Sequence, residues 1–224
     1  MENTQLSAAT EDYLKVIWTA QEWTDKPLTV SALSAHMGFS PSSVSEAVKK
    51  LTRQGLLTHA RYGSIALTDA GLAAAVRMVR RHRLIETFLV EYLEYSWDEV
   101  HDEAEQLEHA VSDKMVEALA ARLGHPVRDP HGDPIPSVDG SFPPLDALRL
   151  SQCGPGTTGV VARVSDTDPD LLRYLAGLGL NLDVRLQILE HQPYAGTLTL
   201  DAGGRRLDLG LPAAEAIWVL QDAD

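Results

Sequence analysis

The sequence is nearly devoid of cysteine, and its single Cys153 cannot form an internal disulfide. A chain without disulfides fits a reducing cytosol. It contains no apolar run of about 18 residues, the length that a transmembrane helix needs. The first residues, Met1–Gln5, lack the basic and apolar regions of a signal peptide. These absences together predict a cytoplasmic protein.

Catalytic motifs are missing as well. The sequence shows no nucleophile beside an acid–base partner and no glycine-rich loop that could cradle a phosphate. Their absence argues against an enzyme. The chain has 224 residues, of which 44% are hydrophobic and 23% charged. It is therefore long enough for two modest domains with a real core.

The charge distribution is uneven. A formal net charge of −13 argues by itself against nucleic-acid binding. Residues 40–85, however, carry eight basic and two acidic groups, a net charge of +6. Residues 86–150 carry four basic and fifteen acidic groups, a net charge of −11. The sequence thus has one basic block inside an acidic protein.

Three helices are predicted at the N-terminus, over residues 7–23, 29–38 and about 41–54. Gly38 closes the second and Ser40–Pro41 opens the third, as expected for helix ends and starts. Two short helices joined by a tight turn form a helix-turn-helix, whose second helix can enter the major groove of DNA. The residues predicted to contact DNA from this helix are Ser40, Pro41, Ser42, Ser43, Ser45, Glu46, Lys49, Lys50 and Arg53.

A β-hairpin is predicted next, with its turn at Gly63. A helix-turn-helix followed by a hairpin is a winged helix, and Arg61 and Tyr62 at the tip are predicted to reach phosphate or the minor groove. The alternative is a small αβ core without a ligand. The concentration of basic groups in this segment favours DNA.

A stripe of imidazoles and carboxylates is predicted on a later helix. His101, Glu105, Glu108 and His109 stand at i, i+4, i+7 and i+8, which share one helical face. The alternative is a charged surface helix. Carboxylates this close repel one another unless a cation lies among them, and mixed imidazole and carboxylate ligands suit Mn, Fe, Co, Ni or Zn. The pattern therefore indicates a metal site.

A second pair, His82 and Glu86, is four residues apart and also shares one helical face. The alternative for this pair is a histidine at a helix boundary that bonds a nearby glutamate. Asp12 lies near the start of the first helix, where an acid ordinarily complements the helix dipole.

The rest of the chain contains a predicted long helix over about 70–93, then helices starting at Trp97 and at Ser112. Their apolar positions exceed what one subunit covers, which favours a homodimer. Residues 125–149 contain six prolines and read as a linker or an extended strap. His125 and His131 in this segment lack ligand spacing and are left out of the predicted site. Residues 150–224 alternate like short strands, which predicts a small SH3-like barrel.

These features together resemble the diphtheria-toxin-repressor family of metal-activated transcriptional repressors. The resemblance rests on the winged helix, His82-x3-Glu86, the His-x3-Glu-x2-Glu-His motif at 101–109, the Pro130–His–Gly–x–Pro–Ile–Pro136 strap and the barrel, which is similar to a FeoA-type module. It implies a mainly α fold with small β parts. The expected domains are a winged helix-turn-helix at 1–72, a helical metal-binding and dimerisation domain at 73–140 and the SH3-like domain at 141–224.

The resemblance also implies two adjacent metal positions. One would use Asp12, Glu105, Glu108 and His109; the other would use His82, Glu86 and His101. Some long family members draw further ligands from the barrel, where Asp166 and Asp168 are candidates.

The ligand types resemble the manganese-responsive branch. The iron-responsive branch typically has Met in place of Asp12 and Cys in place of Glu105, whereas hard oxygen ligands favour Mn²⁺. Short manganese regulators lack the barrel and often carry an acid where this chain has Lys15. We therefore expect a Mn²⁺-activated homodimeric repressor of manganese homeostasis genes that binds double-stranded operator DNA, with two metal sites per subunit.

Other readings stay open at this point. Fe²⁺, Co²⁺ or Zn²⁺ could replace Mn²⁺ in vitro, and an iron-responsive repressor of the same family is the first alternative. Because histidine and glutamate clusters also serve enzymes, a metal-dependent hydrolase is another. The third is a winged-helix regulator that responds to a small organic ligand.

Overall fold

The computed structural model describes residues 6–60 and 63–222 of the chain. Arg61 and Tyr62, which were predicted to contact DNA, lie outside the described residues. The chain divides into two compact units: Met1–Arg81 with Pro136–Ser141, and His82–Ile135 with Phe142–Asp224. None of the helices in the described part of the chain is long and apolar enough to span a membrane.

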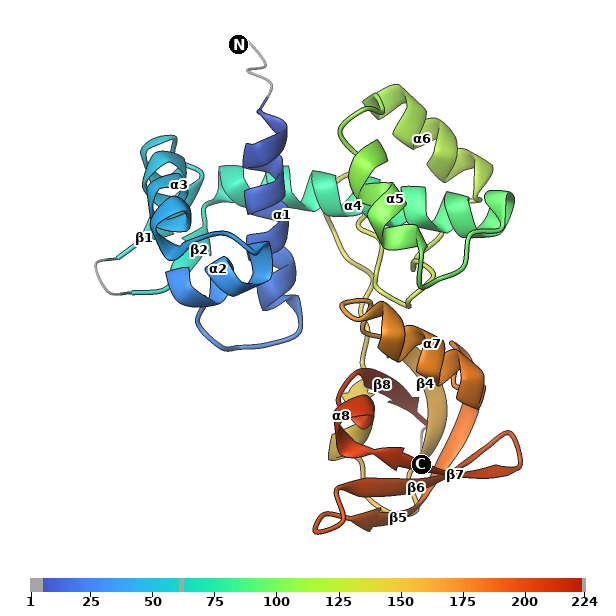
Figure 1. Cartoon of the computed structure of the whole chain (residues 1–224). Helices are drawn as coiled ribbons and strands as arrows, with labels where there is room; N and C mark the ends of the chain where they lie inside the picture. Colours follow the sequence, from blue (N-terminus) through green and yellow to red (C-terminus); the bar gives the residue numbers. More distant parts are fainter. Residues whose placement is uncertain (1–5, 61–62, 223–224) are drawn as a thin grey trace. The chain divides into compact units, whose positions relative to one another are not determined.

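The first unit contains the predicted winged helix-turn-helix (Figure 1). Its elements are α1 (Ala8–Glu22), α2 (Val30–Met37), α3 (Pro41–Arg53), β1 (Leu57–His59), β2 (Ile65–Leu67) and the first part of α4 (Asp69–Leu93). The strands pair antiparallel, with Leu57 opposite Leu67 and His59 opposite Ile65. The predicted arrangement of helices and hairpin is confirmed.

Local signals in the sequence account for the tight turn between α2 and α3. Gly38 has a φ of +67°, a left-handed conformation that ends α2 at little cost. Ser40 then caps α3, since its hydroxyl accepts a hydrogen bond from the backbone N–H of Ser43 at 3.2 Å. The inward face of α3 packs into the core of the unit through Val44, Val48 and Leu51.

In the second unit, the remainder of α4 packs with α5 (Val100–Leu107) and α6 (Asp113–Arg122). Five side chains form one buried cluster among these helices: Ile85, Leu89, Val100, Ala104 and Leu119. Helical periodicity alone predicts α4 and α6 well, because both bury one apolar face.

Helix α5 ends earlier than the stripe prediction assumed. Its last residue is Leu107, Glu108 is its C-cap and His109 belongs to the following turn. The N–H of Ala110 bonds the carbonyl of Leu107 at 2.9 Å, three residues back, which tightens the chain into a turn. The predicted stripe is therefore not one helical face along its whole length. His109 lies in the turn after α5, and the turn sets the direction of its side chain.

The proline-rich segment is ordered as a buried strap over residues 129–136. Asp129 Oδ1 accepts hydrogen bonds from the N–H groups of His131 and Asp133 at 2.8 and 2.9 Å. The carbonyl of His131 accepts the N–H of Val164 at 2.8 Å. Of the two readings of this segment, linker or strap, the structure supports the strap.

The C-terminal part of the second unit is a curved antiparallel sheet in the order β3-β8-β4-β5-β6-β7 (Figure 1). Its elements are β3 (Leu148–Arg149), η1 (Leu150–Gln152), β4 (Thr158–Val164), α7 (Pro169–Leu178), β5 (Arg185–Gln192), β6 (Thr197–Ala202), β7 (Arg205–Gly210), α8 (Leu211–Ala214) and β8 (Ile217–Gln221). Leu172 and Leu175 of α7 are buried in its core. We call this part the barrel.

Candidate metal centre

The predicted DNA-contacting residues lie on the solvent side of α3 and its cap. Most of them are exposed: Ser40, Pro41, Ser42, Ser43, Glu46, Lys49, Lys50 and Arg53; Ser45 is half-buried. Lys49 Nζ donates to Glu46 Oε1 at 2.8 Å, and this bond lowers the pKa of Glu46. The helix therefore presents hydroxyl groups at its start and positive charge toward its end.

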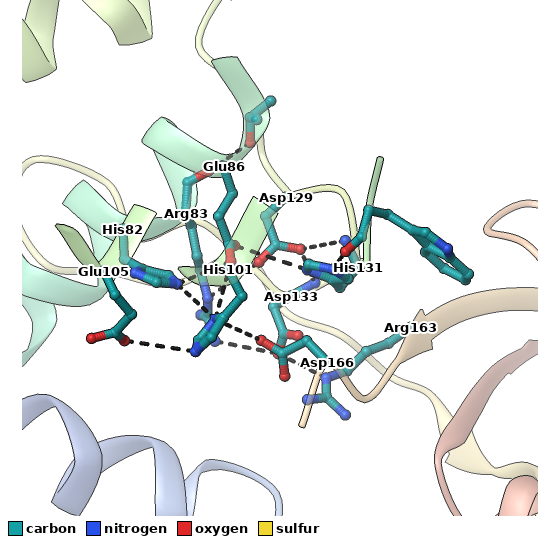
Figure 2. A network of polar contacts seen from close by, with 12 residues as sticks. His82, Arg83, Glu86, His101, Glu105, Asp129, His131, Asp133, Arg163 and Asp166 are labelled. Carbon is teal, nitrogen blue, oxygen red and sulfur yellow. Dashed lines mark hydrogen bonds and ion pairs between the residues drawn. The ribbon is translucent and has the colours of Figure 1, made fainter. Parts of the chain in front are cut away.

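The first cluster of candidate metal ligands joins α4 and α5. His82 Nε2 lies 3.0 Å from Glu86 Oε1 and 3.2 Å from His101 Nδ1, and His101 Nδ1 lies 3.3 Å from the same glutamate oxygen (Figure 2). Ligands in adjacent positions around one ion at about 2.1 Å lie about 3 Å apart. The structure therefore brings together the three residues of one predicted ligand set, with donors spaced as around a single ion.

A short hydrogen bond connects this cluster to the C-cap of α5. His82 Nδ1 lies 2.6 Å from Glu108 Oε2, and both side chains are buried. Ligand atoms of His82, Glu105 and Glu108 lie within 4.8 Å of one another. Figure 2 shows Glu105 pointing toward His101, whose Nε2 lies 3.7 Å from its carboxylate. The imidazole of His82 thus lies between the carboxylate of Glu86 and those of Glu105 and Glu108.

A histidine that was left out of the predicted site also lies beside this cluster. His131, from the strap, is fully buried, and its Nδ1 faces Glu86 Oε2 at 3.9 Å. Its Nε2 donates to the carbonyl of Trp97 at 2.6 Å, so in the neutral imidazole the lone pair is on Nδ1. Ligand atoms of Glu86, His131 and Asp166 lie within 4.8 Å of one another. We call these three residues the barrel-side cluster.

Spacing could not have found His131, because it lies in an irregular segment between prolines. The strap motif around it was the available signal. Its neighbour Asp129 is also buried, and burial, with Asp133 and Glu86 nearby, raises the pKa of Asp129 to about 7. Of the two acids predicted from the barrel, Asp166 lies in the cluster, where its carboxylate is 3.7 Å from His101 Nδ1.

Three other predicted ligands lie outside the barrel-side cluster. Asp168 is exposed and caps α7, since its Oδ1 accepts the N–H of Asp170 at 2.9 Å. His109 Nε2 lies 3.5 Å from Glu108 Oε1. Asp12 lies on α1 in the first unit. The ligand set that combines Asp12 with residues of α5 stays a prediction.

The charges around Glu86 show what the cluster can hold. Burial alone would raise the pKa of Glu86, but His82, His101 and His131 hold it well below its ordinary value. The hydrogen bond that His101 donates to the Glu86 carboxylate raises the pKa of His101. Burial favours the neutral form of His131, yet Glu86 and neighbouring carboxylates raise its pKa. The carboxylates thus attract positive charge, which protons supply on the imidazoles and a divalent cation could supply instead.

Two orphaned atoms point to the same conclusion. Among the described residues, neither Glu86 Oε2 nor His131 Nδ1 has a hydrogen-bond partner, and both atoms are buried. Buried polar atoms are almost always paired, so two unpaired atoms that face each other fit an ion between them. Cys153, the one cysteine, lies in the barrel core and cannot add a thiolate. The donors present are imidazole nitrogens and carboxylate oxygens, which suit a hard or borderline divalent ion.

Comparison with protein-family models gives three matches in the order of the elements. Residues 5–65 match the iron dependent repressor N-terminal DNA-binding domain, and residues 68–137 match its metal-binding and dimerisation domain. Residues 148–221 match the FeoA domain. These models describe a DNA-binding and dimerising protein with a metal site.

Individual relatives span nearly the whole chain. The iron-dependent repressor IdeR of Mycobacterium leprae is 31% identical, over 94% of this chain and 96% of its own. A solved manganese-dependent transcriptional repressor in complex with manganese is 52% identical, with a TM-score of 0.91 over 95% of this chain and 99% of that chain. The manganese regulator SloR is 34% identical, with a TM-score of 0.80 over 95% and 98%.

The family consists of transcriptional repressors, not enzymes, which sets the hydrolase alternative aside. The domain matches, the full-length relatives and the metal-ligand clusters agree. The chain belongs to the iron-dependent repressor family, also known as the diphtheria-toxin-repressor family, of metal-dependent transcriptional repressors.

Proposed function

We propose that the chain is a Mn²⁺-activated homodimeric repressor, which binds operator DNA when loaded with metal and controls manganese homeostasis genes in the cytoplasm. The observation that carries the proposal is the buried pair of orphaned donors, Glu86 Oε2 and His131 Nδ1, beside the His82–His101 cluster. The 52% identical manganese-dependent repressor supports the choice of ion. The proposed domains remain 1–72, 73–140 and 141–224.

The proposed ligands form two metal positions per subunit. One set is Asp12, Glu105, Glu108 and His109, and the other is His82, Glu86 and His101. The geometry supports extending the second set with the two further members of the barrel-side cluster, His131 and Asp166. Asp168, which caps α7, is not included in the proposal.

The oxygen-rich donor set supports manganese. Asp12 and Glu105 stand where iron-responsive members typically have Met and Cys, so every proposed donor is a carboxylate oxygen or an imidazole nitrogen. Later transition metals bind most sites more tightly than Mn²⁺, and their advantage is greatest with soft ligands. Hard donors reduce that advantage.

In the proposed mechanism, Asp12 ties the first helix of the winged unit to the acids around the end of α5. The bound cation supplies the positive charge that offsets repulsion among these carboxylates. Joined in this way, the two winged helices of a dimer would be held at a spacing of about 34 Å, one turn of DNA. Exposed Lys49 and Lys50 would then contact phosphates while the hydroxyls at the start of α3 approach base edges.

Without metal, repulsion among the acids would lower the fraction of dimers that can bind DNA. The apparent affinity for DNA falls in proportion to that fraction. Metal and DNA must then strengthen each other's binding by the same factor.

An iron-responsive repressor is the second candidate. The observation in its favour is the similarity to IdeR, which is named as iron-dependent. The donor set argues against it, because the thiolate expected of that branch is absent from position 105.

The test is a metal-by-metal titration of DNA binding. Duplexes that bind the protein are first selected from a random-sequence library in Mn²⁺, and affinity is then measured with Mn²⁺, Fe²⁺ under anaerobic conditions, Co²⁺, Zn²⁺ and a chelator. We expect binding to strengthen at least about tenfold with Mn²⁺, within the usual range of allosteric coupling. Equal affinity in Mn²⁺ and in chelator would refute the proposal.

The paired control is Asp12→Met combined with Glu105→Cys, which installs the donors of the iron-responsive branch. This variant should lose its response to Mn²⁺ while it responds to Fe²⁺ or Co²⁺, because softer ligands favour later metals. A wild-type protein that responds to Fe²⁺ but not to Mn²⁺ would favour the iron-responsive alternative.

A further inference from the structure

Four charged side chains outside the proposed ligand set are almost fully buried beside it. They are Arg83, Asp129, Asp133 and Arg163, each at most 6% exposed. Burying an ion pair costs desolvation that often exceeds the attraction gained, so such pairs are weak sources of stability. Their presence therefore calls for a reason other than stability.

Asp133 joins two elements through a single oxygen. Its Oδ1 accepts a hydrogen bond from Arg163 Nε at 2.7 Å and another from Arg83 Nη2 at 3.3 Å (Figure 2). Arg83 follows His82 directly on α4, and Arg163 lies on β4, three residues before Asp166. One carboxylate thus ties the helix that carries Glu86 to the strand that leads to Asp166.

Both arginines are held by further contacts. Arg83 Nη1 donates to the carbonyl of Pro134 at 2.7 Å, and its Nε lies 3.6 Å from Asp129 Oδ2. The guanidinium of Arg163 stacks on the ring of Trp218 in the barrel, 4.1 Å from its centroid. The position of Asp133 is therefore set from α4 and from the barrel together.

His131 lies in the strap between Asp129 and Asp133, the two acids that Arg83 contacts. The strap around it is pressed against β4: a Cβ at Gly132 would lie 2.1 Å from the carbonyl oxygen of Ala162. The carbonyl of His131 bonds the N–H of Val164 on the same strand. A shift of the strap would move the imidazole away from Glu86 and Asp166.

We propose that Asp133 is the positioning residue of the barrel-side cluster: through Arg83 and Arg163 it holds His131 and Asp166 at ligand distance from Glu86. The inference rests on the proposed function, since it assumes that this cluster binds Mn²⁺. Asp133 itself touches no metal in this account. Its role is to make one site from a helix, a strap and a strand.

The test measures Mn²⁺ affinity of the full-length chain by calorimetry and by the electron paramagnetic resonance signal of free Mn²⁺. Asp133→Asn keeps the shape of the side chain and removes its charge. It is measured in two backgrounds: His109→Ala, where the remaining binding reports on the barrel-side cluster, and His131→Ala, where that cluster has lost a ligand. Asp139→Asn is the matched control, since this exposed carboxylate lies three residues beyond the strap and accepts hydrogen bonds from Ser141.

In the His109→Ala background, Asp133→Asn should weaken Mn²⁺ binding about 10- to 100-fold, the usual effect of removing an outer partner of a ligand. In the His131→Ala background it should change the affinity less than about twofold, as for sites without shared partners. Asp139→Asn should match the parent chain in both. Unchanged affinity in the first background, or equal weakening in both, would overturn the proposal, because equal weakening indicates a general loss of structure.

Two further outcomes are distinguishable. If Asp133→Asn does not fold, Arg163→Lys replaces it, because that change keeps the charge and removes the Nε donor. It should weaken the same cluster selectively, and an unchanged affinity would overturn the proposal. If His131→Ala binds Mn²⁺ like the wild type, the barrel-side cluster holds no ion and this inference falls with it. Activation of DNA binding by Mn²⁺ would still decide the proposed function separately.

Discussion

Replacement of Gly132 by alanine probes a close approach between the strap and β4, beside the proposed metal centre. Gly132 has a φ of +92°, and an added Cβ would lie 2.1 Å from the carbonyl oxygen of Ala162 and 2.8 Å from the Cα of Arg163. Both are backbone atoms of β4, which cannot swing aside. The strap would have to lift by about 1 Å or more to reach an ordinary contact distance.

The cost follows from the two parts of this change. A positive φ at alanine costs about 1–2 kcal/mol. Lifting the strap also breaks the hydrogen bond from the N–H of Val164 to the carbonyl of His131, worth about 0.5–1.5 kcal/mol net. The packing of the strap against β4 is loosened as well. We expect Gly132→Ala to lower the free energy of unfolding by about 2–4 kcal/mol.

Gly140→Ala is the matched control for this experiment. Gly140 has a φ of +84°, but a Cβ there would meet only ordinary contact, with Val76 Cγ1 at 3.7 Å. This variant should therefore show the backbone cost of about 1–2 kcal/mol alone. Urea unfolding measures both stabilities and calorimetry measures Mn²⁺ affinity, which only Gly132→Ala should weaken. Equal stability losses with equal Mn²⁺ affinity would refute the reasoning.

Three further predictions concern other parts of the chain. Ser40→Ala should destabilise the protein by about 1 kcal/mol in urea unfolding, because it removes the cap of α3; an unchanged midpoint would contradict this. Lys50→Ala should weaken DNA binding across sequences and reduce the salt slope of log affinity by about 1, if Lys50 contacts a phosphate. The hydrogen bond from Arg173 lowers the pKa of Asp98, so its stabilising effect is present above the unfolded pKa of about 3.9 and is lost as pH falls through the folded value. Arg173→Gln should make the acid loss of stability shallower in unfolding measured from pH 3 to 6, and an identical pH profile would exclude that contribution.

The sequence predicted the elements whose signals are local. Helices α1 to α4 follow from apolar spacing and from caps such as Ser40 and Gly38, which act within a few residues. The candidate ligand pair of His82 and Glu86 was visible for the same reason, since both stand on one face of α4. The end of α5 was misplaced, because a helix can stop without a Gly or Pro to mark it.

By itself, then, the sequence determined the winged helix and the helical pairs of candidate ligands with their hard donor atoms, all of which depend on neighbours within about one or two helical turns. Only the tertiary structure decided that His131 and Asp166 lie together beside Glu86. It also decided that Asp133 accepts hydrogen bonds from two arginines that are 50 and 30 residues away in the chain. The physical reason is that burial creates these roles. An acid or imidazole in an irregular segment carries no periodic signal, and it becomes a ligand or an anchor only when packing removes water and brings distant charges together.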